Sequence, residues 1–371
     1  MKVIFIVQGE GRGHLTQAIT LERLLRRSGH EVTAVLVGKS RRRSLPRFFL
    51  ENIQAPVRQF ASPNFRPGQA NRRSRLARSV LYNVASLPLY ARSTAFVRRE
   101  IKESGADLVV NFYELITGLA YLFLPPDVPQ VCIGHQYLFL HHGFRFPHTN
   151  RAALWGLNVF TRLTSVGACR RLALSFRPMP DDGRERMAVV PPLLREDVMR
   201  LQPTTGNYIH GYMVNDGFAA DVEAWHRAHP DVALRFFWDR KGAPAVKRID
   251  TTLTYYALDD RAFLQQMAGC RAYASTAGFE SICEAMLMGK PVLMVPAHIE
   301  QECNAYDAAL SGAGIVGRRF DLDRLTGFAA THRPDPAFGA WVRSAGPRIV
   351  DELERAAAAP LYGLAARAGL A

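Results

Sequence analysis

Near the start of the sequence, a histidine follows three alternating glycines. Gly9, Gly11 and Gly13 precede His14 and come directly after an apolar run at residues 2–7. Glycine lets the backbone approach a ligand closely, and the N-terminus of a following helix favours negative charge. A histidine that is neutral near pH 7 can take a proton from a hydroxyl group. We therefore predict that His14 is a general base, the alternative being a histidine that only caps a tight turn.

The spacing of glycines in this part of the sequence excludes two common nucleotide-binding motifs. Gly9 to Gly13 read Gly-x-Gly-x-Gly, whereas a dinucleotide-binding turn needs Gly-x-Gly-x-x-Gly. Gly38, Lys39 and Ser40 resemble the end of a P-loop, but Thr33 stands where that loop needs its first glycine. Neither a dinucleotide fold nor a P-loop is predicted.

A second stretch, residues 274–285, has the composition of a phosphate-binding turn. Small residues follow a short strand and lead into an apolar helix, whose first N–H groups can bind an anion. The candidate ligands are Ser275, Thr276, Ala277, Gly278 and Ser281. Glu284 lies about one turn further along, within reach of ribose hydroxyls if phosphates bind at the helix start. Taken alone, the same residues also fit a plain helix cap followed by a solvated glutamate.

Polar residues at other strand ends are candidates for a binding cleft. Glu114, His135 and Gln136 follow predicted strands, and ligands of open α/β sheets bind at such ends. Together with Gly11, Gly13 and Thr16 they form the predicted acceptor side, although a polar residue at a strand end can be only a turn or cap. His141, His142 and His148, and the pairs Asp181/Asp182 and Asp321/Asp323, lack convincing ligand spacing, so no metal is predicted.

The candidate residues follow strands that the sequence predicts to form two parallel sheets. Apolar strands at 2–7, 31–37, 107–111 and 128–133 alternate with helices, which predicts a doubly wound sheet. Strand-like runs at 208–212, 234–238, 251–254, 271–275 and 292–295, with helices such as 221–229 and 279–288, predict a second one. Residues 187–192, rich in proline at their end, begin the predicted linker. The predicted domains are 1–190, 191–335 and a helical segment, 336–371, that can cross back to the first.

The second half resembles a known family. The order of Gly278, Ser281, Glu284 and Ala285, then Gly289-Lys290-Pro291, a buried strand, and Glu300-Gln301 with Asn304-Ala305 is similar to the donor region of GT-B glycosyltransferases. The resemblance is to UDP-glycosyltransferases and to the N-acetylglucosaminyltransferase that makes lipid II. It implies two Rossmann-like lobes facing a cleft, and transfer of a sugar from a nucleotide diphosphate sugar, UDP-linked in its relatives, with no further cofactor.

The resemblance also implies a role for each matching position. Gly278, Ser281 and Thr276 would hold the diphosphate, Arg195 would reach it from the linker, and Glu284 would bind the ribose. Glu300 and Gln301 would bind sugar hydroxyls, and His14 would be the base or position the acceptor. Two positions depart from the family pattern: many relatives have histidine at Thr276 and asparagine at Glu280.

Charge is concentrated in the first hundred residues. The chain has a net charge of +14, and residues 1–100, with 19 Lys/Arg and 5 Asp/Glu, account for all of it. The basic clusters are Arg41, Arg42 and Arg43, and Arg72, Arg73, Arg75 and Arg78. Beside apolar helices, they predict an anionic membrane surface and a lipid-linked or polyanionic acceptor, the alternative being solvated loops.

The remaining sequence features concern compartment and rival functions. Five unpaired cysteines, no cleavable leader and no apolar run long enough to span a bilayer predict a cytoplasmic protein. The basic clusters add the expectation that it binds peripherally to the inner face of the membrane. A nucleotide-sugar epimerase or hydrolase on the same fold is one alternative. A basic, non-catalytic nucleic-acid-binding protein is another, but no nucleic-acid motif supports it and nucleic acid is not an expected partner.

Overall fold

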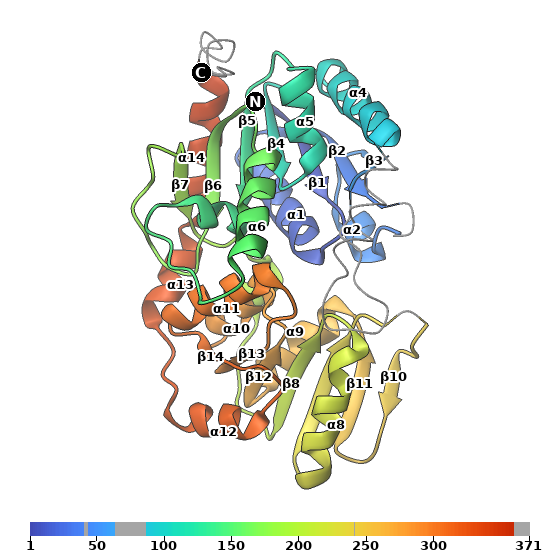
Figure 1. Cartoon of the computed structure of the whole chain (residues 1–371), viewed down its shortest axis with the longest axis vertical. Coiled ribbons are helices and arrows are strands. Elements are labelled where there is room, and N and C mark those ends of the chain that lie inside the picture. The colour runs from blue at the N-terminus through green and yellow to red at the C-terminus, as the bar shows by residue number, and fades with distance from the viewer. Residues whose placement is uncertain (41–43, 64–86, 241, 360–371) are drawn as a thin grey trace.

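A computed structural model describes residues 1–40, 44–63, 87–240 and 242–359 as two α/β lobes (Figure 1). Each lobe is built on a seven-stranded sheet. The clusters Arg41 to Arg43 and Arg72 to Arg78, predicted to face a membrane, lie outside the described residues. Within the described part of the chain, no helix is both long and apolar enough to span a bilayer.

The first sheet is parallel throughout, with strand order β3-β2-β1-β4-β5-β6-β7. Its strands are β1 (Lys2–Gln8), β2 (Glu31–Lys39), β3 (Val57–Ala61), β4 (Leu108–Phe112), β5 (Gln130–Gly134), β6 (Ala168–Leu174) and β7 (Met187–Val190). The chain reverses direction across the sheet between β1 and β4. Loops diverge at this point, so it is where a doubly wound sheet binds ligands.

Helices cover both faces of this sheet because its strands are apolar on both sides. One face carries α1 (Arg12–Arg27), α2 (Arg47–Asn52) and the C-terminal helix. The other carries α4 (Leu87–Glu103), α5 (Leu115–Phe123) and α6 (Arg151–Thr164), with the short helix η1 (His135–Leu140) at the end of β5.

The second sheet has the order β10-β11-β9-β8-β12-β13-β14, and its edge strand β10 alone runs antiparallel to its neighbour. Its strands are β8 (Tyr208–Met213), β9 (Ala233–Trp238), β10 (Val246–Arg248), β11 (Leu253–Ala257), β12 (Ala272–Ser275), β13 (Val292–Met294) and β14 (Gly314–Val316). One face packs against η2 (Asp216–Phe218), α8 (Ala219–Ala228) and α12 (Leu322–Thr331). The other packs against α9 (Asp260–Gly269), α10 (Phe279–Leu287) and α11 (Ile299–Leu310).

The C-terminal helices return to the first lobe, as the sequence predicted. After α13 (Pro336–Arg343), α14 (Ala345–Ala358) lies along the first sheet (Figure 1). Ile349 and Leu353 are fully buried there, and Arg170 of β6 donates to the carboxylate of Glu352 at 2.7 Å. The lobes are therefore joined by α13–α14 as well as by the linker that carries α7 (Glu196–Arg200).

The predicted linker is wrong over its first four residues. Met187–Val190 is β7, paired with β6 and fully buried, so the chain leaves the first sheet only at Pro191. The strands β3, β6, β10 and β14 were not predicted, and β11 begins two residues later than expected. Short or charged strands such as β3, which reads VRQFA, give little hydrophobic alternation from which to predict them.

Candidate active site

His14 lies in the first turn of α1, where side chains of the first lobe are hydrogen-bonded to the second. It is 8% exposed, and its ring stacks on Tyr113 with ring centroids 5.7 Å apart. Tyr113 follows β4 with φ at +60°, a strained value for a residue with a side chain. Strain of this kind persists only where the surrounding structure enforces it, and here it keeps the tyrosine ring against His14.

Burial lowers the pKa of His14 below its ordinary value of 6.5, although Glu300 and Gln17 act in the opposite direction. The imidazole is therefore neutral at pH 7. Its Nδ1 lies 3.4 Å from Oε1 of Gln17, and its Nε2 lies 3.4 Å from Nε2 of Gln136. Gln17 was not predicted to be a site residue. Its position three residues after His14 on the same helix is the signal that could have identified it.

Both glutamines beside His14 also reach the second lobe. Gln17 donates to Oε1 of Glu280 on α10, and Gln136 donates to Oε1 of Glu300 on α11 at 2.9 Å. His14 thus lies at the centre of a hydrogen-bonded chain that crosses the cleft and has a glutamate at each end. Sequence analysis identified the histidine, Gln136 and Glu300 separately, and the structure brings them together.

The predicted phosphate-binding turn leads into α10. Gly278 is the residue before this helix, and within the described part of the chain no side chain caps its first N–H groups. Ser281 donates to the carbonyl of Gly278 at 3.2 Å, and Ala277 holds the turn with φ at +60°. The hydroxyl of Thr276 accepts from the N–H of Val214, so this residue also fixes the loop after β8. The uncapped helix start is suited to an anion.

Arg195 and Glu284 are paired with each other. The guanidinium donates to Oε1 of Glu284 from Nη2 at 2.6 Å and from Nε at 3.1 Å, and Asp260 lies 3.7 Å from Nη1. Burial raises the pKa of Glu284, and Arg195 opposes that shift. The predicted diphosphate ligand and the predicted ribose ligand therefore form one ion pair, in which Glu284 lies five residues after the first residue of α10.

Glu300 and Gln301 are adjacent in sequence but have different surroundings. Glu300 faces Gln136 across the cleft. Gln301 is buried, and its Oε1 accepts from the N–H of Ala297 at 2.9 Å, so its side chain oxygen holds the loop before α11. Of the two predicted sugar-binding side chains, Glu300 is the one joined to the first lobe.

Phe279, the first residue of α10, connects the predicted phosphate site to the first lobe. Its ring stacks on His135 at 4.1 Å between centroids with 17° between planes, and Phe176 is 4.7 Å away. His135 donates from Nδ1 to the carbonyl of Leu174 at 2.7 Å in its neutral form, and burial lowers its pKa. His135, predicted to contact the acceptor, therefore lies against the second lobe.

Glu114 occupies a separate position, at the ends of β2 and β4. Its Oε1 accepts from Ser62 at 2.6 Å, and burial raises its pKa to about 7. Within the described residues its Oε2 has no hydrogen-bond partner, and it lies so close to Gly38 that a Cβ there would be 2.3 Å away. No hydrogen bond to His14 is present in the described structure. The prediction that Glu114 contacts the acceptor thus rests on its place in the fold and not on a contact with His14.

Of the remaining first-lobe candidates, Thr16 and Gly13 have structural roles, whereas the space around Gly11 does not require a glycine. The hydroxyl of Thr16 donates to the carbonyl of Arg12 within α1. A Cβ at Gly13 would lie 3.2 Å from Cγ of Glu280, so glycine there allows the lobes to approach closely. A Cβ at Gly11 would meet only the tip of Gln8, at 3.9 Å.

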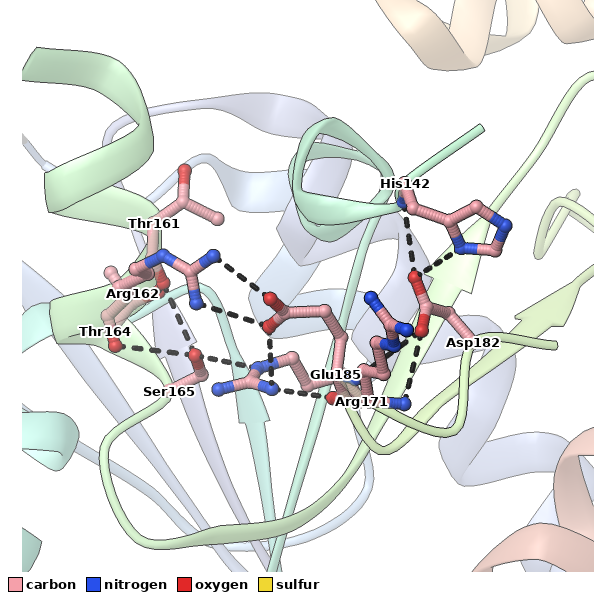
Figure 2. Close-up of polar contacts among 9 residues, drawn as sticks. His142, Thr161, Arg162, Thr164, Ser165, Arg171, Asp182 and Glu185 are labelled. Atoms are coloured by element: carbon pink, nitrogen blue, oxygen red, sulfur yellow. Dashed lines mark hydrogen bonds and ion pairs between the residues drawn. The ribbon is translucent and has the colours of Figure 1, made fainter. Parts of the chain in front are cut away.

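One cluster in the described residues has the residue types of a metal site. The ligand atoms of His141, His142 and Asp182 lie within 4.8 Å of one another. Figure 2 shows His142 bonded to Asp182 through both its backbone N–H and its ring, at 3.0 and 2.8 Å. His141 uses both ring nitrogens, donating to the carbonyl of Pro180 and accepting from the N–H of Gly143. The cluster thus fixes two loops through its own hydrogen bonds.

Two facing α/β lobes of this topology, with a histidine and an uncapped helix start at the cleft, define a GT-B glycosyltransferase. A family model described as "Glycosyl transferase family 1" matches residues 1–331. The chain belongs to that family, and it is a glycosyltransferase. A search of curated protein sequences finds no match.

Solved structures share the fold across nearly the whole chain. The glycosyltransferase of kitacinnamycin has a TM-score of 0.63 at 15% identity, with 96% of this chain and 98% of that one covered. An Arabidopsis thaliana UGT protein complexed with UDP-L-rhamnose gives 0.59 at 14%, covering 95% and 97%. The Acinetobacter baumannii protein MurG gives 0.54 at 17%, covering 95% and 99%. At these identities the likeness is one of fold.

Proposed function

We propose that this glycosyltransferase moves a sugar from a UDP-sugar to an acceptor hydroxyl, with inversion at the anomeric carbon and without a metal ion. The observation that carries the proposal is the position of His14. It is a buried, neutral imidazole at the cleft, joined through Gln136 to Glu300, a predicted sugar ligand. A base at this place can activate a hydroxyl directed at the anomeric carbon of a donor in the second lobe.

The donor proposal rests on the start of α10 and on Arg195. The helix start supplies N–H groups and Arg195 supplies a fixed positive charge, which together suit a diphosphate. A structural neighbour is complexed with UDP-L-rhamnose and another with UDP, which favours uridine as the base. Glu284, released from Arg195, would bind the ribose hydroxyls.

The proposed reaction balances with the residues present and the two substrates. His14 takes the proton of the acceptor hydroxyl, and the oxygen forms a bond to the anomeric carbon. The bond from that carbon to the diphosphate oxygen breaks, and the UDP leaving group carries the negative charge. The start of α10 and Arg195 stabilise this charge. Attack on the face opposite the leaving group inverts the configuration of the sugar.

We also propose that the first lobe binds an anionic membrane surface, through the face formed by α4, α5 and α6. Among the described residues of this lobe, every large apolar side chain that is exposed, except Leu50, lies on that face. They are Leu87, Leu122, Phe123, Leu124, Trp155 and Val159, with Phe123 at 69% and Trp155 at 70% exposure. The helices are neighbours in the order α4, α5, α6 (Figure 1).

Basic residues are exposed on two of the same helices as these apolar side chains. Arg92, Arg98, Lys102 and Arg151 are exposed on α4 and α6. Aromatic and aliphatic side chains beside arginines are what an interfacial membrane site requires, since each basic residue near an anionic leaflet contributes about 1 kcal/mol. A membrane surface would suit a lipid-linked acceptor. Nucleic acid would use the same arginines but would not need the apolar side chains.

The experiment that tests the proposed function is a thermal-shift screen followed by a donor-consumption assay. UDP, UDP-glucose, UDP-N-acetylglucosamine and UDP-rhamnose should include at least one ligand that raises the melting temperature, with the matching ADP and GDP compounds as controls. If none of them shifts the melting temperature, the proposal is wrong. Donor turnover that needs no acceptor beyond water would instead support the epimerase or hydrolase alternative.

A further inference from the structure

The amide of Gln136 is hydrogen-bonded to both His14 and Glu300. In the proposed reaction, these two side chains would instead bind the acceptor hydroxyl and the donor sugar. The Nε2 atom of Gln136 lies 2.9 Å from Oε1 of Glu300 and 3.4 Å from Nε2 of His14. Gln136 belongs to η1 in the first lobe, and Glu300 belongs to the first turn of α11 in the second. One buried amide group therefore connects the proposed base to a predicted sugar ligand across the cleft.

The hydrogen-bond partners fix the direction of every bond in this chain. A carboxylate only accepts, so the atom of Gln136 that faces Glu300 is the amide nitrogen. The same NH₂ group faces Nε2 of His14, which must therefore carry a lone pair. The proton of the neutral ring then lies on Nδ1 and points to Oε1 of Gln17, whose NH₂ group donates to Glu280.

This arrangement identifies Nε2 as the basic nitrogen of His14 and shows what stands in front of it. An acceptor hydroxyl that is to lose its proton must donate to Nε2, the same bond that the Gln136 amide makes. The amide NH₂ group thus takes the place of the acceptor hydroxyl. Its bond to Glu300 is the stronger of the two, since it is shorter and its acceptor is a carboxylate.

We propose that Gln136 is a positioning residue that covers the base until a donor sugar takes Glu300. This rests on the proposed function, in which Glu300 accepts from sugar hydroxyls. Once those hydroxyls compete for Glu300, the amide loses its stronger partner and can leave Nε2. The donor then binds before the acceptor, and UDP without a sugar leaves His14 covered.

Imidazole ¹⁵N spectra of the full-length protein labelled at histidine test this coupling, with His14 assigned from a His14→Asn variant. UDP-glucose should move the Nε2 resonance of His14, whereas UDP at saturation should leave it within the spread of the other histidines. Equal changes with both ligands would overturn the proposal while leaving donor binding intact. If none of the uridine compounds of the thermal-shift screen binds, the proposed function itself fails, and this inference with it.

A Gln136→Ala variant supplies a second measurement. The amide stabilises the neutral form of His14, so its loss should raise the histidine pKa by about one unit and remove the difference between UDP and UDP-glucose. Hydrolysis of UDP-glucose without acceptor should change by less than about threefold, because the bound donor sugar already uncovers the base in the unmodified protein. Gln202→Ala, at an exposed linker position, is the matched control.

Gln136→Glu separates this role from a merely structural one. A carboxylate at position 136 would accept from a protonated His14, so the histidine pKa should rise further than in Gln136→Ala. The pH profile of UDP-glucose hydrolysis should shift to higher pH by the same amount. A histidine pKa that is unchanged in both variants, with melting temperatures near that of the unmodified protein, would contradict the proposal.

Discussion

Arg195 and Glu284 form a bidentate contact on a single carboxylate oxygen, at 2.6 and 3.1 Å, on the helix whose start we propose binds the diphosphate. Glu284 is almost fully buried and Arg195 mostly so. Each side chain neutralises the charge of the other, and an unpaired buried charge would lower the stability of the fold. A diphosphate that attracts Arg195 would free Glu284 for the ribose, so the two predicted ligands change partners together.

The first prediction concerns this pair. Arg195→Ala should weaken UDP binding by about tenfold or more, because it removes a charge-assisted contact. It should also lower stability by about 3–5 kcal/mol, because Glu284 is left buried without its partner. Adding Glu284→Gln should restore part of that stability but not the UDP affinity. Denaturant unfolding and UDP titration measure the two effects. A double variant no more stable than Arg195→Ala would contradict the pairing.

The second prediction concerns His14. His14→Ala should lower the rate of donor turnover by about 100- to 10,000-fold and leave donor affinity near its original value. In the unmodified enzyme, the pKa of His14 is held below 6.5 by burial, so activity should persist at pH 6.5. It should fall only as the pH drops through the lowered value. An unchanged rate in the variant, or an acid limb above pH 6.5, would exclude His14 as the base.

The third prediction concerns Glu280. Burial raises its pKa to about 8, against an ordinary value of 4.5. Below pH 4.5 the carboxyl group of Glu280 is protonated in both the folded and the unfolded chain. Between pH 4.5 and about 8 it is protonated only in the folded chain. Stability therefore falls between pH 4.5 and 8 on account of this group. Glu280→Gln should gain in melting temperature relative to the unmodified protein as pH rises from 5 to 8. Glu31→Gln, at an exposed position, should show a constant difference.

The fourth prediction concerns the interlobe contact of Phe279. Removing its ring deletes the stack on His135 and should lower stability by about 3 kcal/mol. Phe279 is the first residue of α10, whose start we propose binds the diphosphate, so loss of the ring should also weaken UDP binding. Phe123→Ala removes the same atoms from an exposed position and should change neither quantity. Calorimetry and UDP titration of the two variants make the comparison, and equal effects would exclude an anchoring role.

The fifth prediction concerns the α4–α6 face. Replacing Phe123 and Trp155 by serine should reduce the affinity for phosphatidylglycerol vesicles by several hundred-fold, as measured by co-sedimentation, since about 2 kcal/mol of apolar burial is lost per side chain, or about 4 kcal/mol for the two. Leu310→Ser, exposed at 43% on the second lobe, is the control. Vesicle binding that is unaffected by the double change would show that this face is not the membrane site. RNA binding lost on neutralising Arg92 and Arg98 would favour nucleic acid instead.

Much of the fold could be predicted because its central strands are long and apolar. The apolar runs at β1 and β4 are typical of buried strands of a parallel sheet. Gly29, with φ at +77°, marks the end of α1. Edge strands such as β10 and β14 have only 3 residues each, too few to show a hydrophobic pattern, so local sequence does not reveal them. The sequence predicts a linker at β7 because two prolines directly follow its four apolar residues.

The site was predictable only within each lobe. His14 and Glu284 could be identified from local motifs, because glycines and a helix start determine what those turns can do. The contacts of Gln17 with Glu280 and of Phe279 with His135 depend on how the lobes face each other. No spacing within one segment contains that information. The pairing of Arg195 with Glu284 joins positions 89 residues apart and was hidden for the same reason.

The return of α14 to the first lobe has a mechanical consequence. The chain passes between the lobes twice, once after β7 and once through α13, and α14 is fixed by Arg170 to Glu352, Arg348 to Asp181 and His30 to Glu354. Two crossings restrict the lobes to rotation about the line that joins them. A protease that nicks the linker near residue 204 would therefore leave two fragments locked as a non-covalent pair, with the cleft still aligned.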